Sequence, residues 1–290
     1  MRIAILILAH KNLEQLEKLV QRLTANFDVY LHLDGKWNIA DDYFSGYKNV
    51  YTIKRFKINW GSYNQILATY ELFKTAFLKD YDFYLIISGQ DLPIKSNKQI
   101  LEFLEKNKNH SFVNNDKLPT RHWLNEGVDN GGFDRIEYYW PDSYGISNFG
   151  DRMRRKAIYK LQNWQRKLKL KRSLYPIEYH GGWNWVNLNK DAVSYLVHFI
   201  EQNPSFLKKF DFTHCADEIW LQTVIMNSGL SIKNDYLRYV DWRGGGWSPK
   251  VLTVDDVPEI LHSNCLFARK FDDKVDEAVI THIYDVTKNE

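Results

Sequence analysis

The chain has 290 residues, of which 44% are hydrophobic and 26% charged, a mix that is typical of a globular protein and excludes a disordered one. Lys and Arg number 39 against 36 Asp and Glu, and the resulting net charge of +3 argues against a dedicated nucleic-acid binder. No stretch is long and apolar enough for a membrane span, and two cysteines, Cys215 and Cys265, cannot build a disulfide framework, so we expect a reducing, cytoplasmic location.

The first hundred residues predict alternating strands and helices. The apolar run at 2–9 is typical of a strand buried on both faces. Asn12 is expected to cap a helix with Gln15 three residues later, and Ser96 opens a capping box with Gln99. Further strands are expected at 28–33, 51–54 and 83–87, and a further helix at 65–77.

These repeated units predict an α/β fold with a mostly parallel, Rossmann-type central sheet and helices on both of its faces. Sheets of this kind bind ligands beyond the carboxyl ends of their strands. The polar loop at 88–95 follows the strand at 83–87, and we therefore expect it to contact a ligand.

The remainder of the chain is less regular. Residues 107–146 are expected to form loops with short strands, Asn189 and Asp217 to cap two helices, and the three glycines at 244–246 to form a flexible loop. The basic stretch at 152–172 has three interpretations: a solvated surface helix, an amphipathic face on anionic lipid, or a nucleic-acid contact. Its cations are Arg152, Arg154, Arg155, Lys156, Lys160, Arg166, Lys167, Lys169, Lys171 and Arg172.

The aromatic content is high, with ten Trp, 18 Tyr and 16 Phe. It indicates either a large aromatic core or a carbohydrate site, because the C–H faces of sugars pack on aromatic rings. The only DxD sequence, Asp80 to Asp82, precedes the strand at 83–87, whereas a metal-holding DxD of a nucleotide-sugar enzyme follows its strand. We interpret it as a helix-exit turn, and a metal-dependent transferase that uses Asp80 and Asp82 stays as an alternative.

Two clusters of charged residues have a chemical interpretation. Glu218 follows the expected cap Asp217 and lies beside Trp220, and desolvation there would raise its pKa, as suits a general base. The alternative is a carboxylate that only favours the helix dipole. Lys250 and the pair Arg269 and Lys270 would neutralise a leaving diphosphate without a metal, or they are ordinary surface charges.

Seven stretches of the sequence, in this order, form one recognisable set: 5–16, 32–34, 60–63, 88–96, 181–190, 217–218 and 248–272. They cover nearly the whole chain, and the pair SGQDLPIKS and LFARKFD at this separation is the most specific part. Together they resemble the core-2/I-branching β-1,6-N-acetylglucosaminyltransferase family, which also contains peptide O-xylosyltransferases.

The resemblance implies a GT-A-like fold in a single domain, with a nucleotide-sugar-binding half at 1–106 and an acceptor-binding and catalytic half at 107–290. It implies an inverting transferase that uses a UDP-sugar, no cofactor and no metal. Glu218 falls on the family's catalytic base, and Lys270, Lys250 and Arg269 on its diphosphate side. The nucleotide side would comprise His10, His32, Asp34, Trp60, Ser62, Tyr63, Gln90 and Asp91. The acceptor side would comprise Arg135, Glu137, Trp183 and Trp185.

The animal members of the family are anchored Golgi proteins with several disulfides, whereas this chain begins at its first strand and has two cysteines. We therefore expect a bacterial, cytoplasmic enzyme at the inner face of the membrane that serves surface polysaccharide assembly. UDP-GlcNAc is the expected donor, with UDP-xylose and UDP-glucuronate as alternatives, and the acceptor is a glycan, which lipid-linked intermediates would supply. A non-catalytic glycan-binding protein that uses the same aromatic residues is the alternative from another class.

Overall fold

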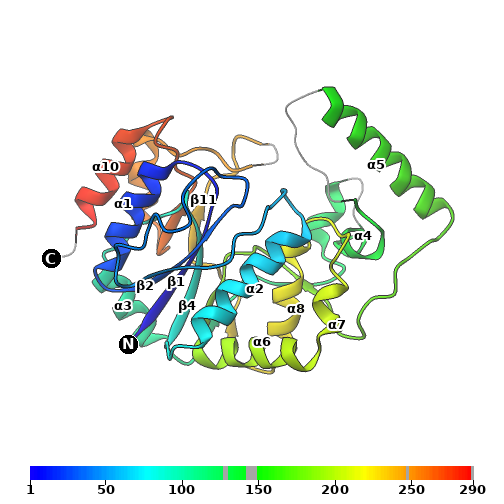
Figure 1. Ribbon diagram of the computed structural model, residues 1–290, viewed down its shortest axis with the longest axis horizontal. Helices are drawn as coiled ribbons and strands as arrows, with labels where there is room; N and C mark the ends of the chain where they lie inside the picture. Colours follow the sequence, from blue (N-terminus) through cyan, green and yellow to red (C-terminus); the bar gives the residue numbers. More distant parts are fainter. Residues whose placement is uncertain (127–129, 142–148, 246–247, 289–290) are drawn as a thin grey trace.

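The computed structural model describes residues 1–126, 130–141, 149–245 and 248–288 (Figure 1). Residues 127–129 and 142–146 of the expected loop region, Gly246, and the side chains of Arg152 and Arg155 lie outside the described residues. Every helix in the described part of the chain is too short or too polar to cross a bilayer.

A mixed sheet forms the centre of the molecule, and its described strands follow the order β10-β6-β9-β4-β1-β2-β3. β1 pairs in parallel with β2 and with β4, and β2 pairs in parallel with β3. β9 is antiparallel to both β4 and β6. The strands are β1 (Ile3–Ala9), β2 (Asp28–Leu33), β3 (Val50–Thr52), β4 (Phe83–Ser88), β6 (Ser111–Phe112), β9 (Asn187–Asn189) and β10 (Ile232–Lys233). The predicted α/β fold with a mostly parallel sheet is therefore confirmed, with β9 as an antiparallel strand.

Helices cover both faces of this sheet because alternate side chains of its strands point to opposite sides. Ile3, Ile5 and Ile7 pack in one apolar cluster with α1, α3, α9 and α10, while Ala4 and Leu6 pack in a second with α2, α6, α7 and α8. The first set is α1 (Leu13–Thr24), α3 (Asn97–Lys106), α9 (Val257–His262) and α10 (Glu277–Val286). The second set is α2 (Tyr63–Phe77), α6 (Lys190–Gln202), α7 (Ser205–Lys208) and α8 (Trp220–Met226).

Two of the four predicted caps are confirmed. Ser96 forms the full capping box with Gln99, and the Asn189 side chain accepts a hydrogen bond from Ala192 N. Asn12 precedes α1, but its backbone is left-handed (φ 58°) and its amide donates to Asp272, so the predicted cap is wrong. The Asp217 cap is also wrong, because Asp217 and Glu218 lie in a 3₁₀ turn, η2 (Ala216–Glu218), and α8 begins at Trp220.

A smaller sheet of the strands β5 (Leu92–Pro93), β11 (Arg238–Val240) and β12 (Phe267–Arg269) packs beside the carboxyl end of β4. The buried Arg238 joins the two sheets, since its guanidinium donates to Ile86 O at 2.9 Å and to Asn187 Oδ1 at 3.1 Å. This contact brings the end of β12, with Arg269, to the ligand-binding edge of the main sheet.

The remaining elements extend from the second helical layer. They include β7 (Asp116–Lys117), β8 (His180–Gly181), η1 (Arg121–Glu126), α4 (Phe133–Glu137) and α5 (Phe149–Lys167), whereas η3 (Val254–Asp256) contacts α9 and α10 of the first set. The predicted basic helix is thus confirmed as α5, which ends at Lys167. Figure 1 shows α5 at the edge of the molecule, away from the sheet.

Candidate active site

A cleft with a volume of about 660 Å³ opens at the carboxyl ends of β1, β2 and β4, where parallel sheets bind ligands. The small sheet supplies its opposite wall through Arg269 and Lys270. Ten of the residues predicted from the sequence line it: His10, His32, Asp34, Trp60, Gln90, Trp183, Trp185, Glu218, Arg269 and Lys270. The structure thus places the candidate base and two of the three candidate diphosphate cations on the wall of one cleft.

Two glycines position the backbone that carries Glu218. Gly182 N donates to Glu218 O at 2.9 Å, and a Cβ on Gly182 would lie 2.0 Å from Asn114 O. Gly61 O accepts from Cys215 N at 2.9 Å, and a Cβ on Gly61 would lie 2.8 Å from Cys215 Sγ. Only glycine allows so close an approach, and these two contacts hold the η2 turn from both sides.

The Glu218 carboxylate is oriented by Arg135. Arg135 Nη1 donates to Glu218 Oε2 at 2.8 Å, and the guanidinium lies 3.9 Å from the centre of the Trp123 ring. Arg135 itself is 7% exposed, so this arginine is held in place beneath the carboxylate. It does not line the cleft wall, and its place in the structure is behind Glu218 rather than at a separate acceptor site.

Arg269 is fixed by two neighbours. Its Nη1 donates to Asp91 Oδ1 at 3.0 Å, and the guanidinium lies 4.1 Å from the centre of the Trp185 ring. Asp91 is fully buried and does not line the cleft; desolvation raises the pKa of its carboxyl, while the charge of Arg269 opposes that shift. Asp91 was predicted on the nucleotide side, but the structure places it behind Arg269, where it positions the guanidinium.

Lys270 differs from Arg269 in its surroundings. Its Nζ lies 3.2 Å from Ser248 Oγ, and among the described residues no ion pair to Lys270 is found. Desolvation, followed by the charges of Lys11 and Arg269, lowers the pKa of the Lys270 ammonium. A cation that its own protein leaves without a carboxylate is suited to bind an anionic ligand.

The β1 and β2 edge presents polar groups to the cleft. His32 Nε2 accepts from Phe56 N at 2.9 Å, which places the ring proton on Nδ1, and burial lowers the pKa of His32 to about 4. Among the described residues, the buried Nδ1 of His32 has no hydrogen-bond partner. Asp34 accepts from Lys36 N at 2.8 Å, and Gln90 donates to Phe271 O at 3.2 Å.

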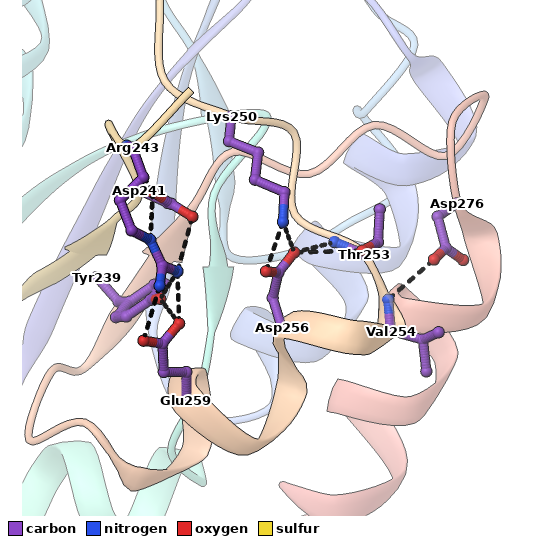
Figure 2. A network of polar contacts seen from close by, with 9 residues as sticks. All are labelled: Tyr239, Asp241, Arg243, Lys250, Thr253, Val254, Asp256, Glu259 and Asp276. Atoms are coloured by element: carbon purple, nitrogen blue, oxygen red, sulfur yellow. Dashed lines mark hydrogen bonds and ion pairs between the residues drawn. The ribbon is translucent and has the colours of Figure 1, made fainter. Parts of the chain in front are cut away.

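Four further predicted site residues lie outside the cleft wall. Lys250 binds both carboxylate oxygens of Asp256, at 2.6 and 2.8 Å, and Figure 2 shows it turned toward Asp256. Glu137 pairs with Lys171 at 2.5 Å. Ser62 precedes α2 and Tyr63 begins it; Tyr63 packs against the second apolar cluster, and burial raises its pKa to about 12.

The anchoring of the 241–256 segment explains the position of Lys250. Arg243 binds Asp241 and Glu259, and Thr253 N donates to Asp256 at 2.9 Å (Figure 2). Lys250 acts as one of these anchors. The cleft-lining residues Ser248 and Pro249 are carried by this segment, so Lys250 supports the wall without forming it.

Several cleft residues were not found from the sequence. Asp217 lines the cleft, and its Oδ2 accepts from Gln65 at 2.8 Å and from Asn184 at 3.2 Å. Its Oδ1 is buried and has no partner among the described residues, and burial raises the pKa of Asp217 to about 6. Trp242 also lines the cleft and stacks on Trp183 with ring centres 5.3 Å apart. The sequence feature that could have indicated Trp242 is its position two residues before the three glycines at 244–246.

The DxD sequence lies at the opposite end of β4. Asp80 pairs with Lys190 at 2.6 Å, and Asp82 accepts from Arg2 N at 2.6 Å. These contacts tie the start of β4 to its neighbours, as expected of a structural turn. In the described part of the chain, no three His, Cys, Asp or Glu side chains come together as a metal site requires.

The Core-2/I-Branching enzyme family model matches residues 3–264, so the chain belongs to this family. It is 24% identical to xylosyltransferase oxt of Drosophila pseudoobscura pseudoobscura over 97% of this chain and 33% of the relative. It is 24% identical to human xylosyltransferase 2 over 98% of this chain and 34% of that protein. The chain thus spans about a third of the length of the curated relatives it matches. Among solved structures, the glycosyltransferase GlyE of Streptococcus pneumoniae aligns with a TM-score of 0.38 and 10% identity, over 94% of this chain and 55% of that one.

Proposed function

We propose that the protein is an inverting glycosyltransferase that moves a sugar from a UDP-sugar to a hydroxyl group of a glycan, without a metal ion. The observation that carries the proposal is the shared cleft, in which Glu218 and the cations Arg269 and Lys270 line the wall at the carboxyl edge of a parallel sheet. Membership in the core-2/I-branching family supports the reaction class.

The reaction is one displacement. Glu218 accepts the proton of the acceptor hydroxyl as its oxygen forms a bond to the anomeric carbon of the donor. The bond from that carbon to the diphosphate oxygen breaks, and UDP leaves with the electron pair. Arg269 and Lys270 stabilise the charge on UDP, a role that needs cations held in place before the reaction. General-base assistance contributes about 10²- to 10⁴-fold to the rate.

The nucleotide would lie over the ends of β1 and β2. His32 would donate from Nδ1 to a carbonyl oxygen of the base, and Asp34 would accept from a ribose hydroxyl. His10 and Gln90 would lie next to the diphosphate, since both line the cleft near β1 and β4. The stacked rings of Trp183 and Trp242, with Trp60 and Trp185, offer flat apolar surfaces for sugars.

UDP-GlcNAc is the proposed donor, and the relatives named xylosyltransferases make UDP-xylose the first alternative, with UDP-glucuronate next. The proposed acceptor is a glycan, in a cytoplasmic, bacterial setting of surface polysaccharide assembly in which a lipid-linked intermediate presents the hydroxyl. A donor screen that measures slow hydrolysis of several UDP-sugars without acceptor would identify the sugar.

The test of the function compares wild-type protein with Glu218→Gln. We expect the variant to retain UDP binding and to lose at least about 100-fold in turnover, because Gln cannot accept the proton. Both UDP binding and turnover should persist in excess chelator. Unchanged turnover in Glu218→Gln, or strict dependence on manganese, would refute the mechanism. Sugar binding without UDP binding would instead identify a glycan-binding protein.

A further inference from the structure

The helix α5 contacts the rest of the protein through a side that carries Gln162, Gln165 and the buried Ile158. The amides of Gln162 and Gln165 both donate to Tyr139 O, at 2.6 and 3.1 Å, and Tyr139 N donates back to Gln165 Oε1 at 3.0 Å. Arg166 pairs with Asp134 at 2.9 Å. Gln162 and Gln165 are buried, so the hydrogen bonds of their side chains attach this side of the helix to the rest of the protein.

One apolar stripe of α5 points away from the protein, whereas Ile158 is buried and Leu161 is half-buried. Met153, Trp164 and Leu168 are 53%, 55% and 49% exposed, and Ala157 is also exposed. Their spacing of four, seven and four residues places them along one side of a helix. A surface helix normally buries such a stripe, whereas α5 buries Ile158 together with Gln162 and Gln165 and leaves this stripe exposed. Leu168 directly follows α5, which ends at Lys167, and Leu170 beyond it is also exposed.

Cations border this apolar stripe. Lys156, Lys160 and Lys167 lie on the adjacent side of the helix at the same spacing, and all three are exposed. Residues 149–172 contain ten Lys or Arg and one Asp, whereas the remainder of the chain contains 29 Lys or Arg and 35 Asp or Glu. The positive charge of the chain is therefore concentrated on α5 and its C-terminal extension.

We propose that α5 docks the protein on the surface of an anionic lipid bilayer, with Met153, Trp164 and Leu168 inserted at headgroup level and the flanking lysines bound to lipid phosphates. Exposed apolar residues between lysines are the pattern of a helix that lies in the membrane interface, and Trp favours that depth. The helix stands at the edge of the molecule (Figure 1), and the side chains of the stripe and the flanking lysines are exposed there. The docking is independent of the reaction proposed above.

Sedimentation of the full chain with vesicles tests this inference. We expect binding to vesicles of phosphatidylglycerol and phosphatidylcholine and little binding to phosphatidylcholine alone. Each lysine near an anionic surface adds about fivefold, so the triple substitution Lys156→Gln, Lys160→Gln and Lys167→Gln should weaken binding about 100-fold. Trp164→Ser with Leu168→Ser should weaken the binding that remains at high salt, because it removes the inserted apolar groups.

The matched control is the substitution of Lys98, Lys106 and Lys108 by Gln, which removes the same charge from exposed sites on or next to α3. We expect this control to bind the anionic vesicles as the wild type does. Circular dichroism of each variant would show that the fold is intact. The inference is overturned if the wild type does not bind the anionic vesicles, or if the α3 control loses as much binding as the α5 variant.

Discussion

Substitution of Asp217 by Asn should stabilise the protein at alkaline pH. The Oδ2 atom of Asp217 accepts from Gln65 and Asn184, and the carbonyl of an asparagine would accept the same two hydrogen bonds. The buried Oδ1 has no partner among the described residues, so an ionised carboxylate there is poorly solvated. Asparagine removes that charge and keeps both contacts, and its NH2 group replaces the unpaired Oδ1 as the buried polar group without a partner.

The magnitude follows from the pKa of Asp217, which burial raises from 3.8 to about 6. An acid with a raised folded pKa is at its most favourable below the unfolded pKa and loses that stability as the pH rises through the folded value. The shift corresponds to about 3 kcal/mol of unfolding free energy at most, and about 2 kcal/mol once water in the cleft is allowed for. For a chain of this length that is roughly 4 °C in Tm.

Thermal denaturation at pH 8 and pH 5 measures this effect. We expect Asp217→Asn to raise the Tm by roughly 4 °C at pH 8 and by about half as much at pH 5. Asp80→Asn is the control, because Lys190 lowers the pKa of the Asp80 carboxyl and its removal should not stabilise the protein at pH 8. The reasoning is refuted if Asp217→Asn gives no gain at pH 8, or a gain that is the same at both pH values.

Four further substitutions test how the site is held together. Lys270→Ala should weaken UDP binding by at least about tenfold in a calorimetric titration, because a desolvated charge pair is lost. Lys250→Ala removes the contact with Asp256 and should lower the Tm more than it lowers UDP affinity. Equal losses of UDP affinity in the two variants would contradict this. Gly182→Ala should lower the Tm, with a loss of about 1–3 kcal/mol in the free energy of unfolding, because the new Cβ would meet Asn114 O. The same clash would displace Glu218, so turnover should fall more than UDP binding. Unchanged turnover would show that the turn adapts. Asp91→Asn should destabilise the protein by about 3 kcal/mol in urea unfolding, because the Arg269 guanidinium loses a buried charged partner. An unchanged free energy of unfolding would mean that Trp185 alone holds the arginine.

Sequence patterns predicted the first half of the fold well because its elements are fixed by local periodicity. β2 lies at the predicted residues, and β1 and β4 lie within one residue of their predicted ends, since continuous apolar runs between turns leave little choice. The caps at Ser96 and Asn189 are confirmed because each side chain accepts a hydrogen bond from a backbone N–H three residues later, which is a local contact. Asn12 and Asp217 have the sequence of caps, but contacts with Asp272, Gln65 and Asn184 determine their positions, and a local pattern contains no information on those partners.

The site was predicted in part: most of the residues predicted at strand ends line the cleft, whereas several predicted charged residues lie behind it. Residues at the ends of strands line the cleft, because the topology of a parallel sheet brings those ends together. Lys250, Asp91 and Arg135 are near the site, but each binds another side chain: Asp256, Arg269 and Glu218 respectively. A sequence shows which residues carry charge, whereas the pairing that leaves one charge available and neutralises another depends on the folded geometry.

The two cations of the cleft illustrate that difference and predict a pH effect. Arg269 is paired with the buried Asp91, whereas the pKa of Lys270 is lowered mainly by desolvation, with Lys11 and Arg269 as repelling charges. A bound diphosphate adds negative charge beside Lys270 and raises that pKa, so binding takes up a proton when the pH lies between the free and bound values. UDP affinity should therefore fall at a lower alkaline pH than for an ordinary lysine with a pKa of 10.5. In Lys270→Arg the cation stays charged at every pH in this range, and its UDP affinity should lose this alkaline dependence; an identical decline in both proteins would assign the titration to another group.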